Sequence, residues 1–337
     1  VAHSAGILDI KTNILPNADA LFLTAIDPYG HELWRWTFPV NKLNQQTEQL
    51  SPLSSRPTYT ETENDLTVKA NKRTFIFSKK DGQLKGVSVD NRKISFANGP
   101  RFIGARRADR SLDQFYNHDD EKAKEKDRTY SEFPDAAVFT KLDVKQDGGD
   151  LVVTANYKLG NLDKAQWTIN PSGDLALDYT YNFSGVVDLM GIRFDYPEDQ
   201  VISKRWLGAG PYRVWQNRIH GTQYDVWEND YNDPIPGETF TYPEFKGYFG
   251  DVSWMNIQTK EGTISLTNET PDAYIGVYQP RDGRDRLLYT LPESGISVLN
   301  VIPPVRNKVN STDLCGPSSQ PKWVNGPQTG RVIFRFM

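Results

Sequence analysis

Short runs in which apolar and polar residues alternate cover most of the chain. They are rich in β-branched and aromatic residues, and a period of two is typical of half-buried strands. Clear examples are residues 66–70, 73–77, 151–155 and 331–336. No amphipathic stretch of three helical turns interrupts them. The pattern therefore predicts an all-β protein.

Turn dipeptides separate the predicted strands and supply the positive φ that a hairpin needs. They are Asp81-Gly82, Asp147-Gly148, Ser172-Gly173 and Asp282-Gly283. A different break, without periodicity, occurs at residues 48–57, which are polar and rich in Ser and Pro. This composition is typical of a linker between domains. We therefore expect one unit over residues 1–47 and one continuous β domain over 58–337.

Residues 1–47 hold three predicted strands, at 6–14, 21–27 and 33–39. A closed sandwich of the immunoglobulin type needs about seven strands, so this unit is predicted to be a partial immunoglobulin-like domain. The chain also starts at Val1 without an initiator Met or a signal peptide. Together these features favour an internal fragment of a longer protein over a chain whose leader has been removed.

Composition excludes several classes of function. The net charge is −4, and no basic domain is present that could neutralise nucleic-acid phosphates. Cys315 is the single cysteine, so neither an intramolecular disulfide nor a thiolate metal site is expected. No apolar run approaches the ~18 residues of a membrane span. We expect no nucleic-acid partner and no membrane span.

Aromatic residues are concentrated between Trp206 and Trp254, interleaved with acidic, amide and arginine side chains. The C–H faces of a pyranose stack on aromatic rings, which give a large contact area with specific geometry. We predict a sugar-binding surface formed by Trp206, Arg213, Trp215, Arg218, Trp227, Glu228, Tyr242 and Glu244. The alternative is a purely structural β module in which these aromatics fix a long loop to the sheet.

Three segments carry a resemblance to a known family. Residues 75–84 and 166–175 each form a strand, a Gly turn and a second strand, and residues 206–218 read WLGAGPYRVWQNR. The last segment is similar to a signature of the C-terminal β domain of family 2 glycoside hydrolases of the β-galactosidase type. Its Gly-x-Gly-Pro centre and closing Arg218 agree with that signature. Arg213 and Asn217 stand where the family usually has Glu and Asp, which favours a divergent branch.

The resemblance implies a galactose-mutarotase-like supersandwich over residues 58–337, preceded by part of an immunoglobulin-like domain. It implies a non-catalytic C-terminal portion of a hydrolase that takes part in glycan breakdown. Its partners would be carbohydrate, the catalytic barrel and the remaining domains of the parent enzyme. A role in glycan breakdown also suggests a periplasmic or secreted bacterial protein.

Retaining glycoside hydrolysis needs two carboxyl groups about 5–5.5 Å apart, and the resemblance places both on a (β/α)₈ barrel. The chain has no βαβ pattern, so we expect no catalytic residue in it. Asn268-Glu269 imitates the family's acid/base dipeptide, but it precedes a predicted turn at 270–272. An alternative is a stand-alone aldose epimerase that uses His220 with Glu228 or Glu244 as acid and base.

No cofactor is expected. A weaker alternative is Ca²⁺, because hard oxygen ligands suit that ion. The candidate ligands are Asp225, Glu228, Asp230 and Asp233. Their spacing matches no known calcium loop, and a solvated acidic loop is the other interpretation.

Overall fold

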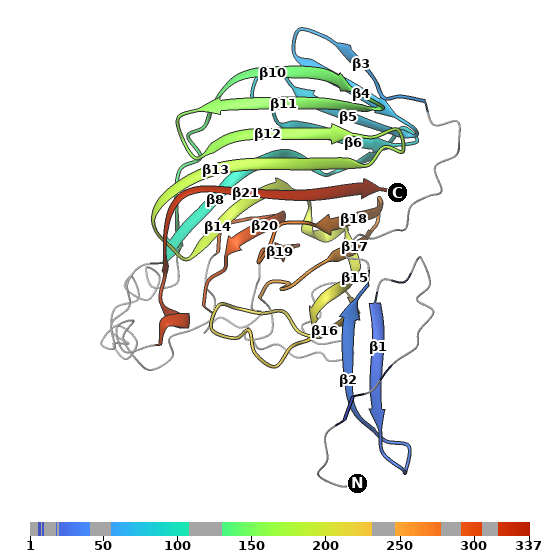
Figure 1. The fold of residues 1–337 in the computed structure, drawn as a ribbon. Helices are drawn as coiled ribbons and strands as arrows, with labels where there is room; N and C mark the ends of the chain where they lie inside the picture. Colours follow the sequence, from blue (N-terminus) through green and yellow to red (C-terminus); the bar gives the residue numbers. More distant parts are fainter. Residues whose placement is uncertain are drawn as a thin grey trace.

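The computed structural model describes residues 6–7, 9, 18, 20–40, 55–107, 130–230, 247–277, 291–304 and 316–337. Within these ranges the chain forms strands and contains no α-helix, so the predicted all-β class is confirmed. Two large antiparallel sheets and one separate hairpin make up the structure (Figure 1). None of the described helices is long and apolar enough to cross a membrane.

The first large sheet has nine strands and joins segments from the middle and the end of the chain. Its spatial order is β10 (Val138–Asp147), β11 (Asp150–Lys158), β12 (Leu162–Ile169), β13 (Leu175–Val187), β21 (Lys322–Phe336), β18 (Gly262–Asn268), β17 (Trp254–Thr259), β15 (Val201–Gly210) and β16 (Gln223–Asp230). The two longest strands, β13 and β21, pair in register from Leu175–Phe334 to Val187–Lys322. This pairing holds the two halves of the sheet together.

The second large sheet has ten strands. Its order is β19 (Tyr274–Gly276), β20 (Ile296–Val301), β14 (Leu189–Asp195), β8 (Ala97–Arg107), β6 (Leu84–Val89), β5 (Arg73–Ser78), β4 (Asp65–Ala70) and β3 (Thr58–Glu61), with β7 (Arg92–Ile94) beside β6 and β9 (Tyr130–Glu132) beside β8. Two short 3₁₀ turns, η1 (Glu198–Gln200) and η4 (Pro317–Ser319), precede β15 and β21.

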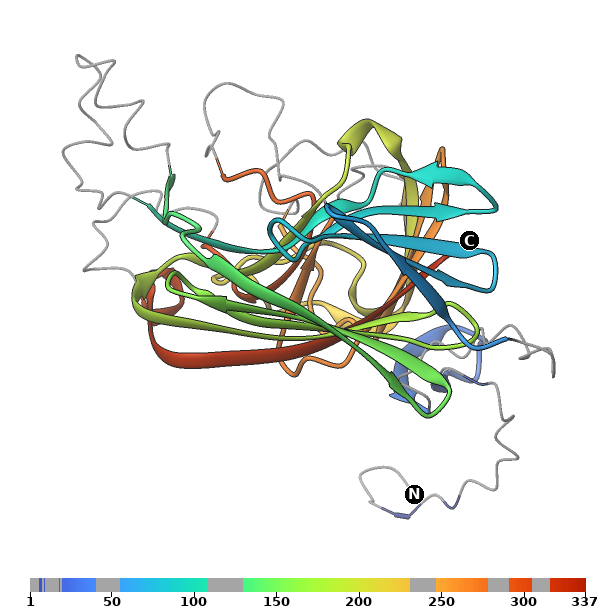
Figure 2. The ribbon, with the colours of Figure 1, turned by 90° about the horizontal axis from the view of Figure 1, so that it is seen from above.

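The two large sheets form two layers, which Figure 2 shows from above. Their apolar faces enclose the main core, and a second, smaller cluster of buried residues includes Leu189, Tyr248 and Leu299. Trp167 of β12 is fully buried and contacts Phe77 of β5 at 5.9 Å and Phe194 of β14 at 6.0 Å between ring centroids. An aromatic side chain of the first sheet thus packs between strands of the second. The predicted supersandwich is confirmed as an architecture of two packed sheets.

The predicted turns between strands are present where the structure describes them. Gly82, Gly148 and Gly173 have φ of 73°, 59° and 84°, which lie in the left-handed region that favours glycine. The Asp282-Gly283 turn and the predicted linker up to residue 54 lie outside the described residues. The large domain begins with β3 at Thr58.

The described part of residues 1–47 is a hairpin of β1 (Ala20–Ile26) and β2 (Glu32–Pro39) that projects from the large sheets (Figure 1). Its turn is fixed by Asp27, whose Oδ1 accepts hydrogen bonds from the backbone N–H groups of Tyr29 and His31, both at 2.8 Å. Two of the three predicted strands are therefore confirmed. The immunoglobulin-like assignment stays a prediction.

One face of the hairpin is apolar and open to solvent. Side chains directly opposite each other on paired strands lie on the same face. The pairs Leu21–Phe38, Leu23–Trp36 and Ala25–Trp34 form this apolar face. Trp34, Trp36 and Phe38 are 50%, 44% and 49% exposed. On the other face, Arg35 reaches Asp225 of β16, with Nη1 and Oδ2 3.6 Å apart.

Candidate functional site

The Gly-x-Gly-Pro sequence lies at the end of β15 and the start of the loop that leads to β16, and the structure explains both glycines. A Cβ on Gly208 would come within 3.0 Å of the Gly250 carbonyl oxygen and the Val252 Cα. A Cβ on Gly210 would come within 2.3 Å of the Trp227 indole. The first glycine therefore permits a close backbone approach, and the second permits an aromatic ring to lie on the strand.

The loop that follows, here called the signature loop (residues 211–222), is held at one side by residues 247–250. Val214 and Tyr248 exchange backbone hydrogen bonds of 2.7 and 2.8 Å. A Cβ on Gly247 would come within 1.9 Å of the Val214 carbonyl oxygen, so only glycine fits there. Burial raises the pKa of Tyr248, and the nearby Arg213 acts in the opposite direction. This side of the loop is a packed scaffold.

The other side of the signature loop is bonded to residues about a hundred positions later. Gln216 Nε2 donates to the carbonyl oxygens of Ser318 and Gln320 at 2.9 and 2.7 Å. Asn217 Nδ2 lies 3.4 Å from Ser319 Oγ. The loop is therefore fixed to η4 and to the start of β21. Asn217, one of the two departures from the family signature, takes part in this contact.

The predicted sugar-binding residues separate into a buried and an exposed group. Trp206, Arg213 and Trp215 are 0%, 1% and 4% exposed. Trp206 packs edge-on against Phe249 at 4.9 Å, and Trp215 packs edge-on against Tyr248 at 5.7 Å. These three side chains form the scaffold of the loop, and the two indole rings present no open face to solvent.

The remaining predicted residues that the structure describes reach the surface. Arg218 and Glu228 are exposed, and Trp227 is half-buried with its Nε1 donating to the Gln223 carbonyl oxygen at 3.1 Å. Tyr242 and Glu244 lie outside the described residues. Arg218 and Glu228 are therefore the described members of the set that are open to a ligand, and Trp227 is open in part, with the rest of its side chain packed against the core.

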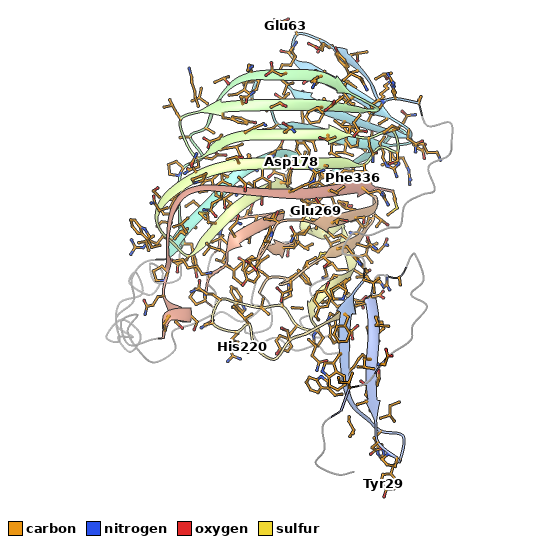
Figure 3. The ribbon with its side chains drawn as sticks, viewed as in Figure 1. Tyr29, Glu63, Asp178, His220, Glu269 and Phe336 are labelled. Atoms are coloured by element: carbon orange, nitrogen blue, oxygen red, sulfur yellow. The ribbon has the colours of Figure 1, made fainter. Side chains whose placement is uncertain are left out.

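Of the residues considered for an epimerase, the structure describes His220 and Glu228. His220 is exposed at the surface end of the signature loop (Figure 3). Glu228 lies five residues beyond Gln223 along β16, which is about 17 Å at the rise of a strand. The described geometry therefore gives no support to a pair of His220 with Glu228. A pair with Glu244 falls outside the described residues.

The candidate calcium ligands also point in different directions. Asp225 lies on the opposite face of β16 from Glu228 and Asp230, because side chains alternate along a strand. Asp225 is 8% exposed and faces Arg35 of the hairpin. Asp233 lies outside the described residues. Within the described ranges no group of three or more His, Cys, Asp or Glu residues could hold a metal ion.

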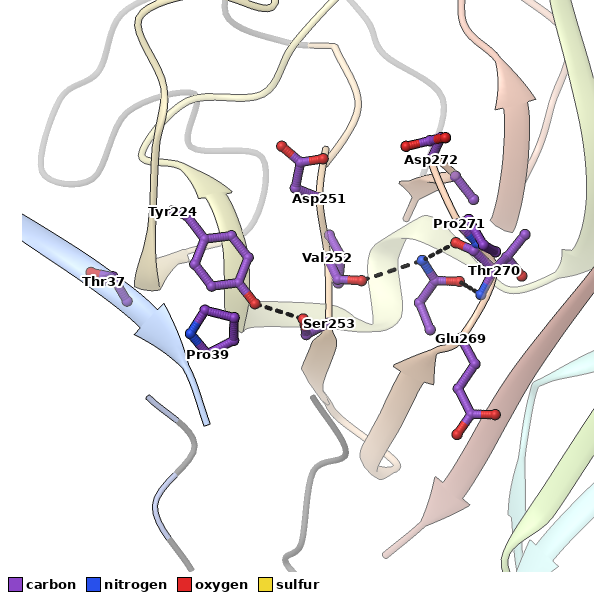
Figure 4. A pocket seen from close by; sticks show the side chains of 12 residues that line it. Thr37, Pro39, Tyr224, Asp251, Val252, Ser253, Glu269, Thr270, Pro271 and Asp272 are labelled. Carbon is purple, nitrogen blue, oxygen red and sulfur yellow. Dashed lines mark hydrogen bonds between the residues drawn. The ribbon is translucent and has the colours of Figure 1, made fainter. Parts of the chain in front are cut away.

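A cavity of about 480 Å³ lies between the hairpin and the large domain, and it contains the Asn268-Glu269 dipeptide (Figure 4). Asn268 fixes a turn, since its Oδ1 accepts from the Thr270 N–H at 3.1 Å and its Nδ2 lies 3.2 Å from the Thr270 carbonyl oxygen. Glu269 pairs with Arg331 Nε at 2.9 Å. The dipeptide thus holds a turn, as its sequence context predicts, and its Glu269 also forms an ion pair that the sequence did not indicate.

The same cavity includes residues that the sequence did not single out. Tyr224 of β16 and Ser253 are joined by a hydrogen bond of 2.6 Å between their hydroxyl oxygens (Figure 4). Burial raises the pKa of Tyr224, and the charge of Asp251 adds to this effect. Tyr224 and Ser253 are 29 residues apart, and no spacing in the sequence indicates that they meet.

The sequence profile of the family described as "Beta galactosidase small chain" matches residues 69–303, which is more than half of the chain. No curated protein matches the sequence significantly. Among solved structures, galactose 1-epimerase from Lactobacillus acidophilus NCFM is similar, with a TM-score of 0.46, 9% identity, and coverage of 84% of this chain and 99% of that chain.

An aldose epimerase homologue from C. elegans has a TM-score of 0.40 and 8% identity, over 83% of this chain and 99% of that chain. The family match covers the large domain from β4 to β20 together with the Gly-x-Gly-Pro segment at its centre. The chain therefore belongs to the beta galactosidase small chain family.

Proposed function

We propose that this chain is the non-catalytic, carbohydrate-binding and structural C-terminal portion of a family 2 glycoside hydrolase that takes part in glycan breakdown. In this proposal the chain docks against the rest of the parent enzyme and helps to shape the rim of its substrate site. The catalytic barrel of that enzyme carries the reaction. The parent enzyme would work in the bacterial periplasm or outside the cell.

The observation that carries the docking part of the proposal is the apolar face of the hairpin. Sheets bury apolar faces against each other in sandwiches, and contiguous exposed apolar patches mark interaction sites. Trp34, Trp36 and Phe38 lie side by side on β2 and are each about half exposed. A matching apolar sheet face of the parent protein is the partner that this surface suits.

The sugar-binding part of the proposal rests on the exposed residues of the signature region. Trp227 offers part of its ring for stacking, and the exposed Arg218 offers a donor for hydroxyl groups. Glu228 follows Trp227 on β16 and lies on the opposite face of that strand, so it is not part of the same contact. The buried Trp206 and Trp215 hold the loop against the sheet. We thus assign sugar contact to the residues that reach the surface, and we assign the positioning of the loop to the buried Trp206 and Trp215.

The proposal is tested by incubating the folded chain alone with nitrophenyl β-D-galactoside, and separately with freshly dissolved α-D-galactose. We expect no release of nitrophenol and no acceleration of mutarotation, while a β-galactosidase and an aldose epimerase run in parallel give both signals. Hydrolysis by the chain would contradict the non-catalytic role. Accelerated mutarotation that disappears in His220→Ala would instead support the epimerase alternative.

A further inference from the structure

A second cavity, of about 710 Å³, lies in the ten-stranded sheet where β14 ends and β8 begins. Its volume is in the range of small-molecule sites, which is about 300–1,000 Å³. It is separate in sequence from the signature loop and from the cavity of Figure 4, with which it shares no lining residue. Here it is called the arginine cavity, after Arg101 and Arg193 in its wall.

Arg101 of β8 and Arg193 of β14 are directly opposite in the register of the two strands. Like charges in this position destabilise a sheet, whereas β-branched and aromatic pairs stabilise it. The Nε atom of each arginine is buried and has no hydrogen-bond partner among the described residues. A pair of arginines here is therefore a poor choice for stability alone.

Acidic groups beside the arginines balance their charge. Asp195 accepts hydrogen bonds from Arg101 Nη2 and, at 2.8 Å, from Asn98 Nδ2. Arg193 donates to the Glu293 carbonyl oxygen, and its Nη2 lies 3.8 Å from Glu132 Oε2. The guanidinium groups are thus held in place while part of each side chain stays exposed, 27% for Arg101 and 19% for Arg193.

The charge of the lining selects the ligand class. Three basic side chains and three acidic side chains face the cavity: Lys93, Arg101 and Arg193 with Asp195, Glu198 and Glu293. An anionic ligand would be repelled by the three carboxylates, and a cationic ligand would be repelled by the three basic groups. A neutral polyhydroxylated ligand can accept from the guanidinium groups and donate to the carboxylates at the same time, because each hydroxyl does both.

The walls of the cavity are fixed before any ligand binds. Glu261, on the turn between β17 and β18, accepts from Ser95 Oγ at 2.6 Å and from Tyr196 hydroxyl at 3.2 Å. Gly295 has a φ of 51°, and a Cβ there would come within 2.2 Å of the Phe194 carbonyl oxygen. Polar groups on rigid elements are what a specific site requires.

We propose that the arginine cavity binds a neutral saccharide, as a site additional to the signature loop. The inference rests on the proposed carbohydrate role of the chain. Arg101, Arg193 and Asn98 donate to sugar hydroxyls, and Asp195 accepts from them. The site has no exposed aromatic ring among its described lining residues, so it recognises the hydroxyl pattern of the sugar rather than its apolar face.

The test is isothermal titration calorimetry of the full chain with methyl β-D-galactoside, lactose and glucuronate. The variants are Arg193→Gln and Asn98→Gly, and Lys145→Gln on the exposed face of β10 is the control. Thermal melting checks that each variant is folded. Asn98 has a φ of 51°, so glycine removes the amide without straining the backbone.

We expect one neutral sugar to bind and Arg193→Gln to weaken that binding by about tenfold or more, since hydrogen bonds to charged groups are the strong ones. Asn98→Gly should weaken it less, and Lys145→Gln should leave it unchanged. Glucuronate should bind more weakly than the neutral sugars.

Three results would overturn the inference. They are unchanged affinity in both cavity variants, preferential binding of glucuronate, and no binding of any neutral sugar to the wild-type chain. If either of the first two results is obtained and Trp227→Ala abolishes the sugar binding of the wild-type chain, the sugar binds at the signature region. The proposed function then stands, and only the arginine cavity is excluded as a sugar site. Failure of the proposed function is seen separately, as hydrolysis or mutarotation by the chain alone.

Discussion

The indole of Trp227 lies on the Cα of Gly210, so close that a Cβ at that position would be 2.3 Å from the ring. The two residues belong to neighbouring strands, β15 and β16, whose register also pairs Trp206 with Trp227. Because the second glycine of the signature has no side chain, the ring of the half-exposed Trp227 can lie against its backbone. A sequence feature of the family is explained by the position of one aromatic side chain.

Gly210→Ala should therefore displace the Trp227 ring and weaken sugar binding at the signature region. Overpacking of this kind costs about 1–3 kcal/mol of stability. The measurement is a denaturant titration together with a sugar titration. Gly86→Ala is the matched control, because a Cβ on Gly86 meets nothing within 4 Å. Equal stability and binding in the two variants would contradict this account of the signature.

The apolar face of the hairpin predicts self-association of the isolated chain. Replacing Trp34 and Trp36 together with Thr should lower self-association in sedimentation velocity, because their exposed rings are removed from the surface. The melting temperature should change little. Val138→Thr is the control, since Val138 is a similarly exposed apolar residue on β10, 42% exposed. If the double variant associates as strongly as the wild type, the face is not a docking surface.

The ion pair of Asp174 with Arg335, at the neighbouring strands β13 and β21, predicts how the free energy of unfolding depends on pH in the acidic range. Arg335 Nε and Nη2 each donate to Asp174 at 2.6 Å. Burial alone would raise the pKa of Asp174, but the hydrogen bonds and charge of Arg335 outweigh it and the pKa is lowered. The pair therefore stabilises the fold above the unfolded carboxyl pKa of about 3.9, and this contribution is lost as pH falls through the lower folded value.

Asp174→Asn should consequently lose about 2 kcal/mol at pH 7, with the difference from wild type shrinking below pH ~4. Urea unfolding at several pH values measures this. Asp143→Asn removes an exposed pair with Lys141 and should change stability by less than about 1 kcal/mol. A pH-independent difference for Asp174→Asn would refute the linkage.

The buried tyrosines predict that the folded state loses stability at alkaline pH. Burial raises the pKa of Tyr179 to about 12 and also raises the pKa of Tyr157, Tyr181, Tyr196 and Tyr248. In the unfolded chain these groups ionise near pH ~10. The unfolded state therefore binds fewer protons above that pH, and stability falls as pH rises.

Absorbance of tyrosinate should rise together with the loss of the circular dichroism of the sheets, and Tyr179→Phe should move this transition to higher pH. Full ionisation of all tyrosines near pH ~10 in a chain that stays folded would be inconsistent with their burial.

The sequence predicted the strands because their signals are local. Alternation over residues 66–70 matches β4, and the glycines of three hairpin turns have the expected positive φ. Contacts between distant segments carry no such signal. Gln216 bonds to residues about a hundred positions away, and Arg101 meets Arg193 across two strands that alternation alone cannot align.

The candidate site shows the same difference between local signals, which the sequence contains, and contacts between distant segments, which it does not. Aromatic density in residues 206–254 marked the region, but it could not tell which rings face the core. Trp206 and Trp215 are buried by Phe249 and Tyr248, and those partners come from the far end of a long connection. Trp227 is half-buried, with its ring against Gly210 and at the edge of the core. Burial of single residues in a loop thus depends on tertiary packing that composition does not contain.

The most direct test of the carbohydrate role is a tryptophan-fluorescence titration of the folded chain with galactose, glucuronic acid, rhamnose and short β-linked oligosaccharides. Trp227→Ala is compared with Trp323→Ala, a control at a tryptophan of β21 that is 71% exposed. We predict saturable quenching by one of these sugars that is lost in Trp227→Ala and kept in Trp323→Ala. No saturable response in the wild type, or the same response in Trp227→Ala, would contradict a sugar site at the signature region.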